Sequence, residues 1–355
     1  FVLLFAMVKI MQDIAKGLGC SEEKAKWTGF MFASSSLLIL TSLIILHLDI
    51  FPLFFALLGI RAMLAGNVRQ ELVFFSVAVL YKPYILLGIL PMLLLQEKRI
   101  LYLVRNAAAV LAGTLLQSVI YHFDAGYAEV KAFMENQYGF VDKFFGSGFV
   151  YERNAQGGIA SYFIISFVLI CVAAYAIRVT PHTEERGGKS IVDRRSLYVL
   201  LPTLVYGSFI LFVEWHPNWL LLLVPFLILT MANARHFHTA CLVETCISLF
   251  AILMSGLGWQ NSYDQNMAAG GFLSKALHLE HQGATICQLL EQVGINMDLY
   301  MSLLAGSVIA MMLLLVWEYK NRNSEEPADS WNRGFVWIRV APAGIFIVFS
   351  IITLF

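Results

Sequence analysis

Charged and aromatic side chains interrupt the long apolar stretches of this sequence at three places. Asp49 lies between two apolar runs, and Lys82 lies in a Tyr-Lys-Pro-Tyr stretch between two others. The third interruption, residues 214–219 (Glu-Trp-His-Pro-Asn-Trp), is the densest cluster of polar and aromatic side chains. An ionised group among apolar side chains is costly unless it is paired or hydrated. The three interruptions are therefore predicted to line one polar site.

Two carboxylates are candidates for acid–base chemistry. Asp49 could act as an acid, a base or a metal ligand, and Glu214 as an acid, a base or an orienting group. Asp49 also has a structural interpretation, because aspartate is a preferred helix cap and Pro52 would lie in the first turn of the next helix. The two roles are compatible, so Asp49 and Glu214 are the predicted catalytic residues.

Three basic side chains are candidates for binding a phosphate group. The Lys82 ammonium would pair well with a phosphate in a low-dielectric site, although a lysine here could instead snorkel to the surface. His216 could contact a phosphate or a hydroxyl, since histidine exchanges protons near neutral pH. Arg153 is a second anion contact or, alternatively, a solvated loop charge.

The side chains around these charges could bind the rest of a substrate. The tryptophans of 214–219 would form a wall on which a sugar stacks, or alternatively an aromatic belt around a tight turn. The predicted substrate-binding residues are Tyr81, Tyr84, Trp215, Asn218 and Trp219.

No metal or cofactor is predicted, and a divalent metal is left open. His278, Glu280 and His281 have a spacing that could bind a metal, but three such side chains on one loop are weak evidence for a site. The five cysteines form no Cys-x-x-Cys pair, and several lie in apolar runs, so they are interpreted as small core residues.

The composition predicts which elements position these residues. The sequence is 59% hydrophobic and 14% charged, with a mean hydropathy of +0.72, whereas soluble domains are about 25% charged. A bilayer would solvate such a surface, and the backbone would then form helices to satisfy its own hydrogen bonds. The formal net charge of +0 indicates no polyanion partner, so no nucleic acid is expected.

A helix needs about 20 apolar residues to cross the hydrocarbon core, and the sequence predicts about ten membrane segments. The longer candidates are 28–47, 106–122, 158–178, 196–214, 238–257, 299–318 and 337–355. The shorter, interrupted candidates are 50–65, 73–81, 83–96 and 219–232. The predicted fold is an all-α polytopic bundle in one membrane domain spanning 1–355.

Residues 73–96 could form one span or a hairpin of two short helices with Lys82 at its tip. Cytoplasmic loops carry an excess of Lys and Arg, and the hairpin satisfies this rule far better than the single span. It leaves few basic residues on the outer side: Lys82, Lys131, Lys143, Arg153 and Lys275. The hairpin also places Asp49, Lys82 and residues 214–219 on that non-cytoplasmic side.

Two longer loops, 123–157 and 258–298, are expected on the same side, and 126–145 has aromatic residues at the spacing of an interfacial helix. The chain begins with apolar residues, and we expect it to start inside a membrane helix. An N-terminal helix and a first outer loop are therefore expected to precede it.

Three blocks of the sequence, within 28–105 and 200–230, resemble the polytopic GT-C glycosyltransferases. The first block is the run from Ser42 to Gly59 around Asp49, which departs from the family at His47, where glutamine is commoner. The others are Lys82-Pro83-Tyr84 followed by Leu90-Pro91-Met92 and basic residues, and His216-Pro217-Asn218-Trp219 followed by Pro225-Phe226.

This resemblance implies an inverting, mannosyltransferase-like hexosyltransferase with a polyprenyl-phosphate sugar donor and a lipid or glycan acceptor. It implies that Lys82 and His216 contact the donor phosphate. The family's catalytic carboxylate usually lies in the first outer loop, so Asp49 would then be a supporting residue. The expected location is the cytoplasmic membrane of a bacterial cell, with the site facing outward.

Two other classes remain open. A transporter or flippase for a lipid-linked or anionic substrate would also use broken helices, although the paired interruptions of a repeat-based transporter are not seen. A non-catalytic membrane scaffold would not need Lys82 and His216 on one side of the membrane.

Overall fold

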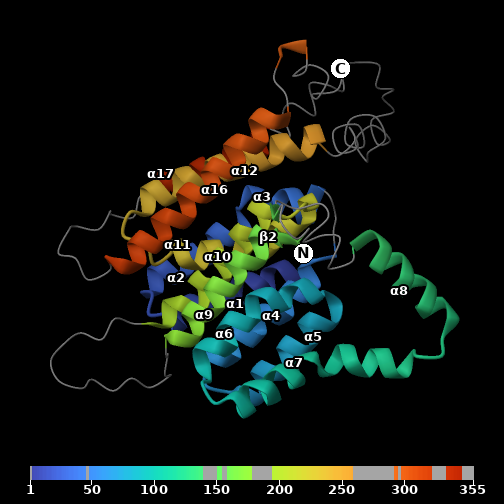
Figure 1. Ribbon diagram of the computed structural model, residues 1–355. Helices are drawn as coiled ribbons and strands as arrows, with labels where there is room; N and C mark the ends of the chain where they lie inside the picture. The colour runs from blue at the N-terminus through green and yellow to red at the C-terminus, as the bar shows by residue number, and fades with distance from the viewer. Residues whose placement is uncertain are drawn as a thin grey trace. The chain divides into compact units, whose positions relative to one another are not determined.

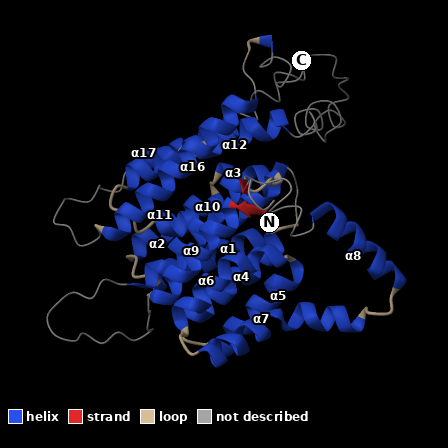
Figure 2. Cartoon of the chain, in the orientation of Figure 1, coloured by secondary structure: helices blue, strands red, loops and turns tan. Residues whose placement is uncertain are grey.

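The computed structural model describes residues 2–44, 48–138, 150–153, 158–177, 194–258, 292–294, 297–321 and 333–345. These residues are mostly helical, which confirms the predicted all-α class. The described strands are β1 (Val150–Arg153) and β2 (Gly158–Ser161), a short antiparallel pair in which Val150 lies opposite Ser161 (Figure 2). The chain divides into two compact units: unit 1 is Phe1–Gly29 with Leu48–Asn233, and unit 2 is Phe30–His47 with Ala234–Phe355.

Unit 1 is a helical bundle whose centre is α10 (Leu197–Phe212). This helix is apolar all round, as expected of a helix buried on every side, and nearly all of its residues are buried. It packs against α6 (Leu86–Gln96), α9 (Tyr162–Ala176) and α11 (Val224–Met231). The bundle also contains α1 (Val2–Gly17), α4 (Ile50–Leu64), α5 (Val68–Tyr81) and α7 (Ile100–Ile120), whereas α8 (Ala125–Tyr138) stands apart from it (Figure 1).

The expected hairpin at Lys82 is present. Lys82 has an extended backbone (φ −148°, ψ 100°) between the end of α5 and the short 3₁₀ turn η2 (Pro83–Ile85). Glu71, near the start of α5, and Gln96, at the end of α6, are hydrogen-bonding neighbours, so the two helices run in opposite directions. The chain reverses here because proline cannot donate the next helical hydrogen bond.

Among the predicted segments that differ in the structure, 28–47 and 158–178 differ most. The segment 28–47 is not one helix: α2 (Glu22–Ala33) ends before Ser34, and the chain resumes as α3 (Ser36–Leu38) and the π-helical turn η1 (Ile39–Ile44). The adjacent serines disfavour a continuous helix because serine is a weaker helix former than alanine, leucine or methionine. The segment 158–178 begins as β2, and its helix starts only at Tyr162.

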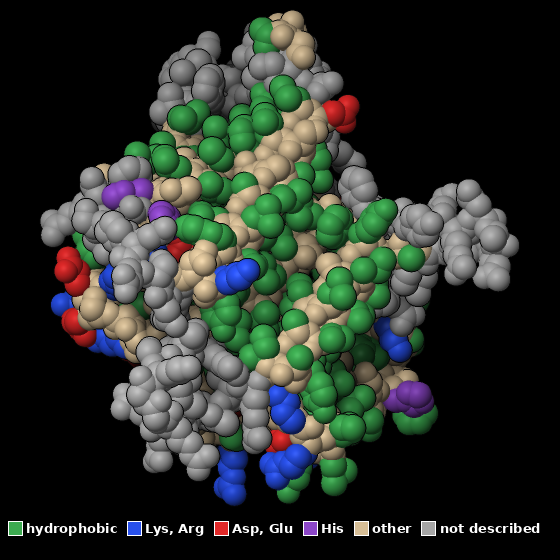
Figure 3. Space-filling view, turned by 60° about the vertical axis from the view of Figure 1, so that its left-hand side comes forward, with side chains coloured by type: hydrophobic (Ala, Val, Ile, Leu, Met, Phe, Trp, Pro, Cys, Tyr) green, Lys and Arg blue, Asp and Glu red, His purple; other side chains and the backbone are tan. Residues whose placement is uncertain are grey.

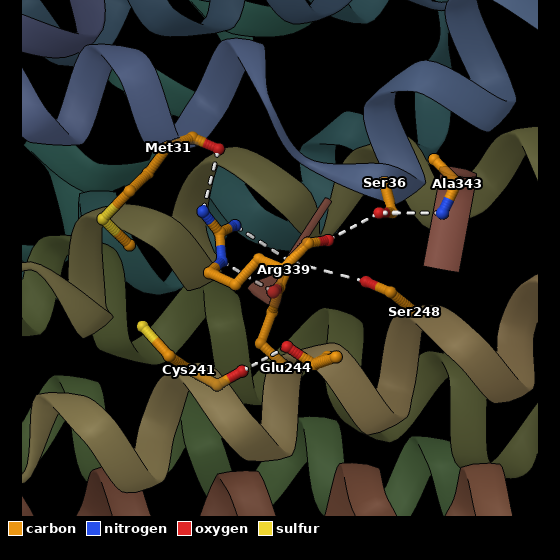
Figure 4. A network of polar contacts seen from close by, with 8 residues as sticks. Met31, Ser36, Cys241, Glu244, Ser248, Arg339 and Ala343 are labelled. Carbon is orange, nitrogen blue, oxygen red and sulfur yellow. Dashed lines mark hydrogen bonds and ion pairs between the residues drawn. The ribbon is translucent and has the colours of Figure 1, made fainter. Parts of the chain in front are cut away.

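Unit 2 is built on the pairing of α12 (Phe237–Gly258) with α16 (Met297–Lys320), to which α17 (Arg333–Ile338) adds. Arg339 is fully buried beside Glu244 of α12 (Figure 4). Its Nε and Nη2 donate to the two Glu244 oxygens at 2.7 and 3.0 Å, and Nη1 donates to the Met31 carbonyl at 3.2 Å. The Ser36 hydroxyl donates to the Arg339 carbonyl. The guanidinium is thus a structural group that ties three segments together.

Three helices in the described part of the chain are long and apolar enough to cross a membrane: Ile100–Ile120, Phe237–Ser255 and Asp298–Lys320. The first of these exposes most of its apolar side chains, among them Leu115, Leu116 and Val119. Apolar side chains cover much of the face in Figure 3. Soluble proteins rarely expose continuous apolar surfaces of this kind.

Candidate functional site

The centre of the candidate site is an ion pair between Lys82 and Asp49 in unit 1. Lys82 Nζ pairs with Asp49 Oδ2, and the two residues are only 8% and 7% exposed. Lys82 is held at the tip of the hairpin, and Asp49 precedes the first residue of α4. The snorkelling interpretation of Lys82 is therefore wrong, because its ammonium is buried against a carboxylate.

Asn218 supplies a second hydrogen bond to the same carboxylate oxygen. Its Nδ2 donates to Asp49 Oδ2 at 2.8 Å, and the residue is 8% exposed. Asn218 lies in the 3₁₀ turn η5 (Pro217–Leu222), where Pro217 fixes the first position of the turn and the Trp219 amide donates to the His216 carbonyl at 2.8 Å. Three segments that are distant in sequence thus meet at one oxygen atom.

Aromatic rings form a wall beside the ion pair. The Lys82 ammonium lies over the Trp219 ring, 5.5 Å from its centroid, which is within the range of a cation–π contact. Tyr84 packs against Trp219 with ring centroids 4.7 Å apart, and Phe209 of α10 contacts both, at 5.9 and 5.3 Å. This wall can receive the apolar face of a sugar ring or an isoprenoid chain.

The backbone around the site is held by buried side chains of α10. The Tyr206 hydroxyl donates to the carbonyl of Ile85 at 3.2 Å, in the turn that follows Lys82. Gly88 makes room for this ring, because a Cβ there would lie 2.8 Å from the Tyr206 hydroxyl. The indole of Trp215 donates to the Ile210 carbonyl at 2.9 Å. Trp215 is therefore a packing residue that anchors residues 214–219 to the helix end.

The other predicted site residues are His216, Tyr81, Glu214 and Arg153. His216 reaches the wall through an edge contact with Trp219, at 5.8 Å between ring centroids. Tyr81 is 62% exposed and stacks on Phe55 at 6.1 Å. Glu214 is exposed. The backbone of Arg153 belongs to β1, but its side chain lies outside the described residues.

The cap interpretation of Asp49 is only half right. Asp49 occupies the residue before α4, yet its side chain makes no capping hydrogen bond to that helix. Its carboxylate serves Lys82 and Asn218 instead. A carboxylate that accepts from an ammonium and an amide is fixed in orientation, which holds the site in one geometry.

Sequence reasoning missed Phe209 and Tyr206, which lie on the same side of α10 three residues apart. Both are aromatic interruptions in an aliphatic run just before residues 214–219, which is the signal that could have indicated them. No group of three or more potential metal ligands occurs among the described residues. His278, Glu280 and His281 lie outside these residues.

Chemically, this arrangement pairs one buried cation with one buried anion, so their charges balance. An incoming phosphate would compete with Asp49 for the ammonium, and a carboxylate freed in this way can accept a hydroxyl proton. Comparisons with protein-family models, with curated proteins and with solved structures give no match, so the function must be inferred from these residues.

Proposed function

We propose that this protein is a membrane glycosyltransferase that moves a hexose from a polyprenyl-phosphate donor to a lipid or glycan acceptor. The observation that supports the proposal is the meeting of Lys82, Asp49 and Asn218 beside the Trp219 ring. A buried cation beside an aromatic wall suits a ligand that carries a phosphate next to a sugar. The resemblance of the same three segments to GT-C enzymes agrees with this assignment.

In this proposal, Lys82 binds the phosphate of the sugar donor. In this reaction the bond between the sugar C1 and the phosphate oxygen breaks, and negative charge develops on the departing phosphate. A fixed ammonium at low dielectric stabilises that charge more than it stabilises the donor, which lowers the barrier. His216 and Arg153 are further phosphate contacts in this proposal.

In this proposal, Asp49 either takes the proton from the hydroxyl group of the sugar acceptor or orients that hydroxyl group. The acceptor oxygen attacks C1 as its proton passes to a carboxylate, so atoms and charge balance without a metal or a redox partner. Asn218 keeps the Asp49 carboxylate aimed at the site. If the N-terminal carboxylate implied by the resemblance is the base, Asp49 positions Lys82 instead. Glu214 is the second candidate for this proton transfer.

We place the enzyme in a membrane as a multi-pass protein of about ten segments, with the site on the non-cytoplasmic face. Support comes from the three helices long enough to span a bilayer and from the shorter apolar helices beside them. A lipid-borne donor suits this location, since its isoprenoid chain stays in the bilayer while its phosphate reaches the interface.

A second candidate is a transporter or flippase for a lipid-linked or anionic substrate. The observation in its favour is the neutral ion pair at the tip of a broken helical hairpin, since transporters use discontinuous helices to bind ions and substrates. Such a protein would bind the same phosphate group and release it unchanged.

The test is an assay in proteoliposomes with polyprenyl-phosphate hexoses labelled in the sugar. We expect labelled glycan or glycolipid product with the wild type, and at least a tenfold loss with Lys82→Met and with Asp49→Asn. Lys131→Met, on the exposed surface of α8, is the matched control and should keep wild-type activity. Label that crosses the vesicle membrane without transfer would favour the transporter. Equal transfer by Lys82→Met would remove the site assignment.

A further inference from the structure

A buried carboxyl group lies at the opposite end of α5 from Lys82. Glu71, near the start of that helix, is 1% exposed, and its Oε1 has no hydrogen-bond partner. No Lys, Arg or His in the described part of the chain forms an ion pair with it. The proposed function makes no use of this group, and the inference below does not depend on that function.

The neighbours of Glu71 are polar but uncharged. The side-chain amide of Gln96, at the end of α6, is its hydrogen-bonding neighbour. Tyr198, 4% exposed on α10, is the titratable group that interacts with it electrostatically. Helices α4 and α7 also pack on α5, and Arg195, shortly before α10, interacts electrostatically with the same Tyr198.

An ionised carboxylate in such a place would be far more costly than a neutral acid. Removing a carboxylate from water without a cation to replace the lost hydration costs several kcal/mol, and in practice the group takes up a proton instead. The neutral acid needs one hydrogen-bond donor for its carbonyl oxygen and one acceptor for its hydroxyl. Gln96 can serve as that donor, or as that acceptor through its amide oxygen.

We propose that Glu71 carries a proton in the folded protein at neutral pH, so that the junction of α5, α6 and α10 is a proton-binding site. The proton can leave only when water reaches the junction. The proton on Glu71 therefore stabilises the closed form of this end of unit 1, and its loss indicates that this end has opened to water.

Glu97 is a natural contrast at the same end of the unit. It lies between α6 and α7, where Arg99 donates to its two oxygens at 3.0 and 2.8 Å and the Lys98 and Arg99 amides donate to Oε1. These contacts, chiefly the side-chain hydrogen bond from Arg99, lower the pKa of Glu97 to about 2. The two glutamates are 26 positions apart in sequence but have opposite surroundings, so Glu97→Gln is a matched control for Glu71→Gln.

The experiment is infrared spectroscopy of the full chain in lipid at neutral pH. A protonated carboxylic acid has a carbonyl stretch above the amide band, which shifts on exchange into heavy water. We expect this band in the wild type and in Glu97→Gln, and its loss in Glu71→Gln. A wild-type spectrum without the band, or one that Glu71→Gln leaves unchanged, would overturn the proposal. If Glu71→Gln does not fold, the absence of the band from the wild-type spectrum still overturns the proposal.

A second measurement follows the free energy of unfolding with pH. The folded state binds one proton more than the unfolded state wherever the unfolded glutamate is ionised, so stability should fall as pH rises. One proton changes the folding equilibrium by at most about tenfold per pH unit. Glu71→Gln should remove this slope. The alternative is that Glu71 binds a metal cation. In that case Na⁺ would stabilise the wild type more than choline does, Glu71→Gln would lose this effect, and the carbonyl band would be absent. This result would overturn the proposal.

Discussion

The Asn218 amide donates to Oδ2 of Asp49, the same oxygen that pairs with Lys82. The two residues of this hydrogen bond are 169 positions apart, so the bond fastens residues 214–219 to the start of α4. Because all three side chains are buried, loss of the Asp49 carboxylate would remove a hydrogen-bond acceptor from both Lys82 and Asn218. This dependence makes the site both a candidate for chemistry and a measurable part of the stability of unit 1.

Removing one member of the Lys82–Asp49 pair should be worse than removing both charges. A buried pair that loses one partner typically costs about 3–5 kcal/mol, because the other charge remains buried and uncompensated. We therefore expect Lys82→Met and Asp49→Asn each to lower the free energy of unfolding by about this amount, and the double variant to recover most of the loss. Thermal or denaturant unfolding in detergent measures all four proteins. Additive losses in the double variant would show that the pair is not coupled.

Gly88→Ala should destabilise unit 1. The new Cβ would lie 2.8 Å from both the hydroxyl and a ring carbon of Tyr206, which is itself buried, so the turn after Lys82 would have to shift. Overpacking of this kind costs about 1–3 kcal/mol. Gly306→Ala is the control, because that glycine lies inside α16 with nothing within 4 Å, and alanine there should stabilise by up to about 1 kcal/mol. The same sign for both variants in unfolding experiments would contradict this packing.

Glu97 should contribute stability that disappears in acid. The side-chain hydrogen bond from Arg99 lowers the pKa of Glu97 from 4.5 to about 2, so the folded state favours the ionised form. Its contribution is present above the unfolded pKa and is lost as pH falls from about 4.5 towards 2. The free energy of unfolding, measured across this pH range, should fall less steeply with falling pH for Glu97→Gln than for the wild type. Equal slopes would mean that the Arg99 contact does not persist in solution.

Glu244→Gln should weaken unit 2 strongly. The amide would keep part of the hydrogen bonding to Arg339 but would leave a fully buried guanidinium without a counter-charge. We expect a loss of about 3–5 kcal/mol in the free energy of unfolding. The control is Glu129→Gln, on the exposed surface of α8, which should change stability by less than about 0.5 kcal/mol. Equal stability of the two variants would show that the pair contributes little.

The sequence alone determined the helical class and the reversal of the chain at Lys82-Pro83. Both follow from local rules: long apolar stretches must satisfy their own backbone hydrogen bonds, and a proline after a lysine interrupts a helix. It also placed Asp49, Lys82 and residues 214–219 at one end of the helices that carry them. The distribution of apolar, basic and proline residues along the chain was sufficient for each of these inferences.

Only the tertiary structure decided which side chains meet. Asp49 could have been a helix cap and Trp215 a sugar-stacking ring, because each interpretation is equally compatible with the neighbouring residues in sequence. The structure chose partners 33, 169 and 95 positions apart: Lys82 with Asp49, Asn218 with Asp49, and Arg339 with Glu244. Such contacts depend on how helices pack, and a buried charge accepts whichever partner that packing brings within reach.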